Sequence, residues 1–434
     1  MREGTVCVGF LGMGNVGTGT LKVLQDNHAE IRQRVGVSIE VRKIVVAHPD
    51  KPRPDWVDRS LITANPDEVL DDPDIDIVVE CIGGLEPAAS YIRKAIRAGK
   101  SIVSANKELL AKEGHAVLEE AARAGVDFFF EGAVAGGIPI IRPLKTSLAA
   151  NRIQEVVGIV NGTTNYILTK MAQEARDFAD VLAEAQRLGY AEPDPTDDIE
   201  GFDAAYKLAI LASISFQNSV PIGRVYHEGI SKVTRRDIEY AKELGYTIKL
   251  LAIGKMTDGA IEVRVHPTLL PTSHPLASVN DVFNAILVRG DAVGDVMFYG
   301  RGAGPLPTGS AVAGDIMDVA RNIKSRATGK IVCTCGVDKP ILSMEQVRTR
   351  YYVRMLVADR PGVLAKIAGV LGDHDVSIAS VVQKEARAGD AEIVWVTHEA
   401  VEENMQKALE LIRELPVVRD VSSVIRVETF GAEI

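Results

Sequence analysis

Three glycines near the start of the chain have the spacing of a phosphate-binding turn. Gly12, Gly14 and Gly17 lie between an apolar run and a helical pattern. Gly12 permits a tight turn, Gly14 lets the backbone approach a pyrophosphate, and Gly17 lets the helix pack on the strand. The free amides at a helix N-terminus suit phosphate. The motif therefore predicts a dinucleotide site that includes Asn15 and Val16. The alternative is a glycine turn in an α/β domain that binds no phosphate.

The second predicted strand, residues 41–46, bears on the choice of dinucleotide. An acid at its end would bond the adenosine ribose and favour NAD. Here Asp50 is displaced from the strand end, and Lys51 and Arg53 follow it. Two basic side chains can meet a 2′-phosphate, so the sequence slightly favours NADP, with dual use open.

The first third of the chain alternates between strand and helix patterns. A continuous apolar run at 75–81, typical of a strand buried on both faces, is followed by a helix at 88–98 and a strand at 101–104. This βαβα alternation predicts an α/β fold with a doubly wound parallel sheet, over residues 1–135. Gly83 would then lie near the nicotinamide ribose.

Ser104 ends the strand at 101–104 and Lys107 lies just past it, on the ligand edge of such a sheet. A lysine in the first turn of a helix faces the positive end of the helix dipole, which is mildly unfavourable. Because such penalties tend to accompany function, Lys107 is a candidate site residue. The alternative is a solvated first-turn lysine without a role.

Asp203 and Lys207 are four residues apart in an expected helix at 201–216, so they share one helix face. The preceding loop cannot be helical because it contains two prolines. Its acids are Glu192, Asp194, Asp197, Asp198 and Glu200. By spacing alone, the simpler interpretation of Asp203 and Lys207 is a surface ion pair worth at most ~1 kcal/mol.

Another strand runs into a glycine-rich turn between Glu131 and Pro139. Glycines let such a turn aim carbonyl oxygens at one point. Carbonyl oxygens with one carboxylate suit a hard monovalent cation better than zinc. A hinge between domains explains the same residues equally well.

The middle of the chain, residues 136–306, reads as an α+β domain for catalysis and dimerisation. Asp258-Gly259 between two strand patterns is a strong hairpin signal. A glycine-rich loop containing Gly302 leads into a helix at 307–323, which we expect to return to the dinucleotide-binding domain. Residues 324–349 read as a linker.

Residues 350–434 have the order βαββαβ, which predicts a ferredoxin-like module. Asp359, Pro361, Gly362 and Val363 form the turn into its first helix. The small glycine leaves room for an amino acid against the backbone. The alternative is a dimerisation module that binds no ligand.

Composition limits the partners. The chain has 434 residues and a net charge of −10, which disfavours nucleic acid. It has no apolar run of the ~18 residues that a membrane span needs. We interpret Cys7, Cys81, Cys333 and Cys335 as reduced thiols of a cytoplasmic protein, because Cys333 and Cys335 lack partners at metal-site spacing.

Six motifs together resemble homoserine dehydrogenase, in its monofunctional form with a C-terminal ACT domain. They are Gly12–Gly17, Ser104–Lys107, Glu131–Pro139, Asn161–Asn165, Glu192–Lys207 and the Gly302–Thr308 loop. The resemblance runs in order from about residue 5 to 350, and Asp359–Leu364 resembles the opening turn of an ACT domain.

The resemblance implies roles for particular residues. Lys207 is expected to be the catalytic acid/base, with Lys107 as a second catalytic lysine near the reacting carbon and the cofactor. Glu192, Asp198 and Asp203 are expected to bind the substrate. The expected cofactor contacts are Gly12, Gly14, Asn15, Val16, Gly17, Gly83, Ser104, Lys107 and Gly302. Oxygens near Glu131, Val134, Gly136 and Ile138 are expected to hold a structural Na⁺.

The implied reaction is reduction of L-aspartate 4-semialdehyde to L-homoserine by NADPH or NADH, within threonine, methionine and isoleucine biosynthesis. An amino-acid effector, threonine first, is expected at Asp359, Pro361, Gly362 and Val363, and the assembly is expected to be a homodimer or homotetramer. Two rival functions stay open at this point. One is a phosphorylating semialdehyde dehydrogenase with Cys81 as its nucleophile, and the other is a non-catalytic sensor of nucleotide and amino acid.

Overall fold

The structure is a computed structural model that describes residues 4–329, 336, 338–384 and 389–430. The chain forms two compact units. The first comprises Met1–Val156, Tyr206–Ile222 and Asn284–Lys339, and the second comprises Val157–Ala205, Gly223–Phe283 and Pro340–Ile434.

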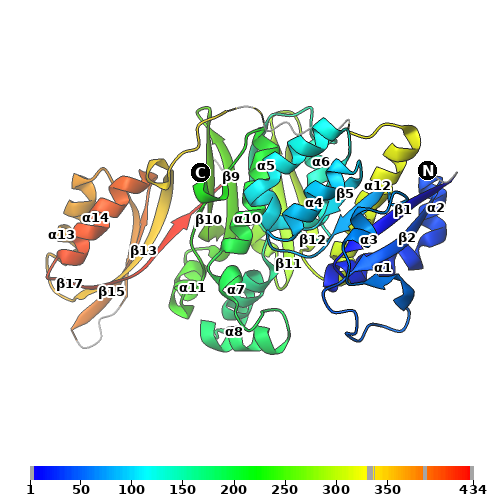
Figure 1. The fold of residues 1–434 in the computed structure, drawn as a ribbon. Helices are drawn as coiled ribbons and strands as arrows, with labels where there is room; N and C mark the ends of the chain where they lie inside the picture. Colours follow the sequence, from blue (N-terminus) through cyan, green and yellow to red (C-terminus); the bar gives the residue numbers. More distant parts are fainter. Residues whose placement is uncertain (1–3, 330–335, 337, 385–388, 431–434) are drawn as a thin grey trace. The chain divides into compact units, whose positions relative to one another are not determined.

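The first unit contains a parallel sheet with the strand order β3-β2-β1-β4-β5-β6 (Figure 1). Its strands are β1 (Thr5–Leu11), β2 (Ser38–Val45), β3 (Ile62–Thr63), β4 (Ile77–Glu80), β5 (Ser101–Ser104) and β6 (Phe128–Phe129). This is the order of a doubly wound dinucleotide-binding sheet, so the predicted α/β class is confirmed. The order reverses between β1 and β4, and ligands bind at the carboxyl ends of the strands at such a point.

The helices of the first unit are α1 (Asn15–Asp26), α2 (His28–Val35), α3 (Asp67–Leu70), α4 (Ala88–Arg97), α5 (Lys107–Ala124), α6 (Ile141–Lys145) and α12 (Pro305–Ser325). The late helix α12 shares one apolar core with β1, through Val312 and Ile316 against Val8 and Phe10. In Figure 1 the yellow ribbon of α12 lies beside the blue elements at the start of the chain. α1 and α12 approach so closely that a Cβ at Gly19 would lie 1.9 Å from the carbonyl oxygen of Pro305. Only glycine fits there.

Two further strands, β11 (Phe283–Gly290) and β12 (Gly294–Arg301), are neighbours in a sheet. β11 precedes Gly302 and α12 in the chain. One more helix, α10 (Phe202–Phe216), begins in the second unit and continues into the first.

The second unit begins within β7 (Ile153–Ile159) and holds α7 (Gly162–Glu174), α8 (Phe178–Arg187), α9 (Thr196–Ile199), β8 (Tyr226–His227) and α11 (Arg235–Glu243). The short helix α9 corrects the expectation that the loop before Gly201 is not helical, because both prolines of that loop precede Thr196 and neither removes an amide from within the helix. Its long hairpin is formed by β9 (Tyr246–Thr257) and β10 (Ala260–Pro271). The two turn residues, Asp258 and Gly259, have φ of 50° and 83°. Both values are positive, as a type I′ turn requires, and the predicted hairpin is present.

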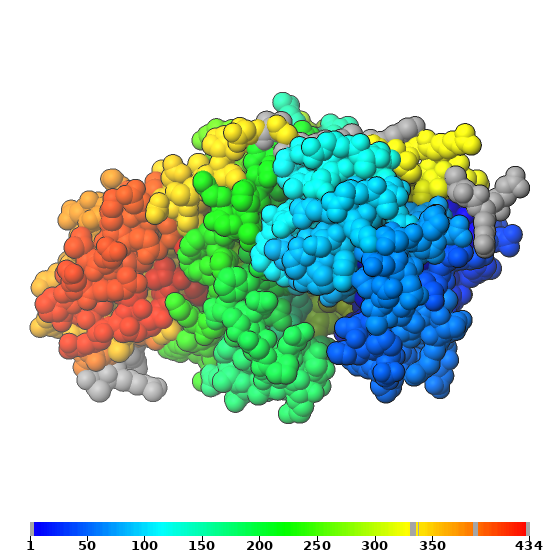
Figure 2. Space-filling model, in the orientation of Figure 1, coloured from blue at the N-terminus to red at the C-terminus, as the bar shows by residue number. Residues whose placement is uncertain are grey.

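The C-terminal module has the predicted βαββαβ order. Its elements are β13 (Arg348–Ala358), α13 (Val363–Asp373), β14 (Ile378–Gln383), β15 (Asp390–Thr397), α14 (Glu402–Glu414) and β17 (Val418–Val427), with a short extra strand β16 (Ala400–Val401). The antiparallel strand order is β17-β13-β15-β14, and the two helices cover one face in Figure 1. In Figure 2 the module is the continuous orange-to-red surface.

β17 also pairs in parallel with β10, through Thr268↔Arg426 and Leu269↔Val427. The module therefore continues the sheet of the second unit. No helix among the described residues is both long and apolar enough to cross a membrane.

Candidate active site

The glycine turn after β1 has the geometry of a phosphate site. Gly12 has φ of 101°, and a Cβ there would lie 2.7 Å from the carbonyl oxygen of Cys81. By contrast, a Cβ at Gly14 would meet no atom within 4 Å, so the space beside this backbone is open. α1 starts directly after Gly14 and receives no hydrogen bond from a capping side chain. The amides of Asn15 and Val16 thus open a helix N-terminus suited to an anion.

Arg53 is held at this turn, although 40 residues separate it from Met13. Its Nη1 donates a hydrogen bond to the Met13 carbonyl oxygen, 2.6 Å away. The structure therefore brings one of the two predicted basic residues to the fingerprint, whereas the side chain of Lys51 is exposed.

A buried carboxylate that the sequence analysis missed organises the loops after β4 and β5. Glu80 is fully buried and accepts hydrogen bonds from the Ser104 hydroxyl at 2.7 Å and from the amides of Ile82 and Gly83 at 2.8 and 3.2 Å. Ser104 in turn accepts the amide of Asn106 at 3.1 Å. The signal in the sequence was an acid at the end of a buried apolar strand.

Asn106 fixes the start of α5. Its side-chain oxygen caps the helix by accepting the Leu109 amide at 3.1 Å, and its side-chain nitrogen donates to the Gly84 carbonyl at 2.7 Å. Lys107, the first residue of α5, is half-buried. The residue before Lys107 is thus held both by the loop after β4 and by α5 itself.

The helix α10 carries Asp203 and Lys207 at the predicted spacing. Asp203 is 4% exposed and Lys207 is 9% exposed. A surface ion pair is therefore excluded as the explanation of this pair. Burial of a charged lysine is unfavourable unless other groups compensate for the lost hydration. The buried position of Lys207 is therefore not that of an ordinary solvent-exposed lysine.

Two of the three expected substrate residues lie together in the second unit. Asn161, the cap of α7, donates hydrogen bonds from its side-chain nitrogen to Asp198 at 2.6 Å and to Asp203 at 2.9 Å. In the sequence, Asn161 stands out only as the first residue of the Asn161–Asn165 motif. The side chain of Glu192 is exposed on the loop after α8.

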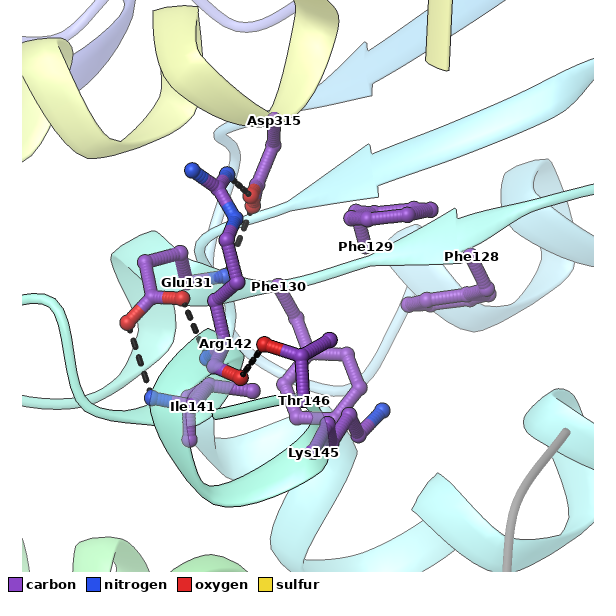
Figure 3. A pocket seen from close by; sticks show the side chains of 9 residues that line it. All are labelled: Phe128, Phe129, Phe130, Glu131, Ile141, Arg142, Lys145, Thr146 and Asp315. Atoms are coloured by element: carbon purple, nitrogen blue, oxygen red, sulfur yellow. Dashed lines mark hydrogen bonds and ion pairs between the residues drawn. The ribbon is translucent and has the colours of Figure 1, made fainter. Parts of the chain in front are cut away.

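The glycine-rich turn after β6 surrounds Glu131, which is buried (Figure 3). One carboxylate oxygen accepts the amides of Ile140 and Ile141 at 2.6 and 2.8 Å, and the other accepts the amide of Arg142 at 2.7 Å. The carboxylate thus closes the turn. The main-chain oxygens of this turn, at positions that include the buried Val134, Gly136 and Ile138, are further possible ligands for a cation.

Asp315 on α12 lies beside this turn. It accepts the Glu131 amide at 2.7 Å and Nη2 of Arg142 at 3.0 Å. Burial, together with the charge of Glu131, raises the pKa of Asp315 to about 8. Together these residues line a small cavity of about 30 Å³ with Phe128–Phe130 and Lys145.

Gly302 lies against the same turn and against β11. A Cβ at Gly136 would lie 2.5 Å from the Gly302 carbonyl oxygen, and a Cβ at Gly302 would lie 1.9 Å from Nδ2 of Asn284. Asn284 is 1% exposed, and its side-chain nitrogen and oxygen have no hydrogen-bond partner in the structure. Sequence analysis did not single out Asn284.

Two of the four thiols and the acidic and histidine side chains can be assessed within the described residues. Burial and the charge of Glu80 raise the pKa of the Cys81 thiol, which keeps it protonated and a weak nucleophile. Cys7 and Cys81 are free thiols. Cys333 and Cys335 lie outside the described residues. Within the described part of the chain, no three His, Cys, Asp or Glu side chains are grouped as metal ligands.

The turn into α13 is open to solvent at Asp359, Pro361 and Gly362, whereas Val363 is buried. Gly362 has φ of 84° and precedes the helix, whose N-terminus receives no hydrogen bond from a capping side chain.

Three family models match the chain. The NAD-binding domain of homoserine dehydrogenase matches residues 12–131, the homoserine dehydrogenase model matches residues 139–317, and the ACT domain matches residues 351–417. The homoserine dehydrogenase of Corynebacterium glutamicum is 47% identical over 98% of this chain and 96% of its own length.

Solved structures agree. A crystal structure of a homoserine dehydrogenase from Thiobacillus denitrificans has a TM-score of 0.92 and 47% identity, and the match covers 98% of this chain and 99% of that one. A hyperthermophilic archaeal homoserine dehydrogenase in complex with NADPH has a TM-score of 0.62 and 27% identity, over 73% of this chain and 97% of that one.

Proposed function

Because the chain belongs to the homoserine dehydrogenase family, we propose that it reduces L-aspartate 4-semialdehyde to L-homoserine, reversibly, with NADPH or NADH. Members of this family are oxidoreductases, and this chain combines their NAD-binding domain with an ACT regulatory domain. The observation that carries the proposal is the buried pair Asp203 and Lys207 on one helix face, within a chain that also has an uncapped glycine turn for phosphate.

Lys207 is the proposed acid/base. A bound nicotinamide supplies the hydride, so the protein has to orient the substrate and handle one proton. As negative charge grows on the aldehyde oxygen, a protonated Lys207 stabilises it and donates the proton. In the reverse direction a neutral lysine accepts the proton from the homoserine hydroxyl. Lys107 is the proposed second cation, because a nearby positive charge lowers the pKa of a lysine.

Asp198 and Asp203, with Glu192, are proposed to bind the amino and hydroxyl groups of the substrate. Carboxylates that accept hydrogen bonds from an ammonium form strong, charge-assisted contacts. The hydrogen bonds from Asn161 to both aspartates support this role for that pair.

NADP is the proposed preferred cofactor, held at Gly12, Gly14, Asn15, Val16 and Gly17, with Gly83, Ser104, Lys107 and Gly302 beside the nicotinamide half. The contact between Arg53 and Met13 supports NADP, since it holds a guanidinium at the phosphate turn. The archaeal relative in complex with NADPH is consistent with this choice.

We further propose a structural Na⁺ at the main-chain oxygens near Glu131, Val134, Gly136 and Ile138. The three amides that donate to the Glu131 carboxylate support this proposal, because they hold the turn that carries these oxygens. The reaction would serve threonine, methionine and isoleucine biosynthesis in the cytoplasm, in a homodimer or homotetramer. Threonine is the proposed effector at Asp359, Pro361, Gly362 and Val363, where an uncapped helix N-terminus suits the carboxylate of an amino acid.

The direct test is an absorbance assay of the full-length protein with L-homoserine and either NADP or NAD. The account predicts homoserine-dependent reduction of the nucleotide, without phosphate, and a lower rate when threonine is added. Nucleotide binding without turnover would instead identify a sensor. If threonine left the rate unchanged, threonine would not be the effector, but the proposed enzymatic activity would stand.

A further inference from the structure

The side chain of Asn161 is fixed in one orientation by its own helix. Asn161 is 5% exposed and ends the segment between β7 and α7. Its Oδ1 accepts both the amide and the hydroxyl of Thr164, each at 2.9 Å. The Thr164 amide can only donate, so the atom that faces it has to be the oxygen. The nitrogen of the same side chain therefore points the other way.

That nitrogen meets two carboxylates from two different elements. Nδ2 lies 2.6 Å from Oδ1 of Asp198 at α9 and 2.9 Å from Oδ2 of Asp203 at the start of α10. A side-chain amide has two N–H groups, and each serves one aspartate. The two acceptor oxygens consequently lie no farther apart than the combined length of these two hydrogen bonds.

The backbone between the two aspartates turns at Gly201, whose amide donates a hydrogen bond to the Asp198 carbonyl at 3.1 Å. Gly201 lies between them, and its φ of 85° is a conformation that favours glycine. Two negative groups at this separation repel one another, so a neutral donor shared between them stabilises the close arrangement.

We propose that Asn161 is a positioning residue for substrate binding, whose amide sets the separation and direction of the Asp198 and Asp203 carboxylates. It acts through the two aspartates and makes no contact with the reacting carbon. The inference rests on the proposed function, because the substrate-binding role of the two aspartates belongs to that proposal. The ligand class is a small primary ammonium compound that also carries a hydroxyl, such as homoserine.

Two variants separate positioning from helix capping. Asp and Ser cap helices about as well as Asn, so Asn161→Asp and Asn161→Ser both retain an acceptor for Thr164. Neither can donate to both aspartates. Loss of a hydrogen bond to a charged group predicts that KM for homoserine rises ~10-fold or more in each variant. The dissociation constant of NADPH, measured by fluorescence without turnover, should stay within ~2-fold of the wild-type value, as expected for a site that Asn161 does not touch.

The pH profile gives a second readout. Asn161→Asp adds a third carboxylate beside the pair, and like charges raise the pKa of a carboxyl group. The acidic limb of kcat/KM should therefore move to higher pH in Asn161→Asp and should not do so in Asn161→Ser.

The outcomes distinguish the two proposals. Wild-type turnover with an unchanged KM for homoserine in both variants would leave Asn161 as a cap only and overturn the inference. An equal loss of NADPH affinity would also overturn it, because the defect would then be general. Absence of turnover in the wild-type protein would instead sink the proposed function.

Discussion

The side chains of Asn106 and Asn161 make the same two kinds of hydrogen bond in different parts of the chain. Each caps a helix with its oxygen, and each uses its nitrogen to hold a neighbouring segment, the Gly84 carbonyl for Asn106 and the two aspartates for Asn161. The capping half of this behaviour was predictable for Asn161, because Asn before a helical pattern is a local signal. The second half depends on residues 37 and 42 positions away, which no local pattern identifies.

Arg53 gives the residue-scale prediction. Arg53→Ala should raise KM for NADP by ~10-fold or more, the usual scale for a lost hydrogen bond to a charged group, with KM for NAD much less affected. Steady-state kinetics with both cofactors measures this. Arg59→Ala, an exposed arginine of the following turn, is the matched control and should leave both values unchanged. If both KM values rose equally in Arg53→Ala, Arg53 would only support the glycine turn through Met13.

At the scale of elements, the parts that local chemistry dictates were predictable. The hairpin at Asp258-Gly259 and the strand at 101–104 are present as expected, since turn residues and apolar runs are local signals. The helix α2 was not predicted. It buries only Ile31 and Val35, so its apolar pattern is too short to recognise. Glu80 was missed because its partners come from two separate loops.

Lys249 on β9 connects its strand to α7 and to the loop that contains Val279 and Asn280. It is 2% exposed and donates to Oδ1 of Asn165, the Val279 carbonyl and Oδ1 of Asn280, at 3.1, 2.5 and 3.3 Å. Burial lowers the pKa of Lys249 to about 8 from 10.5, against the opposing charge of Asp281. A lysine in the unfolded chain still binds its proton up to about pH 10.4.

This shift predicts a pH-dependent stability. Between about pH 8 and 10.5 the unfolded state binds more protons at this site than the folded state, so stability from Lys249 rises with pH there and is lost as pH falls through 8. The denaturant midpoint of the wild type should therefore rise relative to that of Lys249→Met as pH increases across that window. Below about pH 8 the difference between the two midpoints should not change with pH. A difference that is constant from pH 7 to about 10.5 would contradict the account.

At the scale of the whole molecule, the fold class was predictable from the order of patterns, βαβα and then βαββαβ. The way in which the C-terminal module joins its unit was not. β17 extends the sheet of β10, and the buried Arg264 bonds Glu428 at 2.6 Å. Burial opposes ionisation of Glu428, but Arg264 and Lys255 more than offset it and keep its pKa below the usual range. Cutting the module off would leave Arg264 without this partner, so effector tests need the full-length protein.

The most direct test of the central claim is the turnover of Lys207→Ala with homoserine and NADP. The account predicts that kcat falls ~100-fold or more, the usual scale for a general acid/base, while NADPH affinity stays near normal. Lys170→Ala, which removes a lysine paired with Glu174 on α7, should retain full activity. If Lys207→Ala kept the wild-type kcat, Lys207 would not be the group that exchanges the proton with the substrate oxygen.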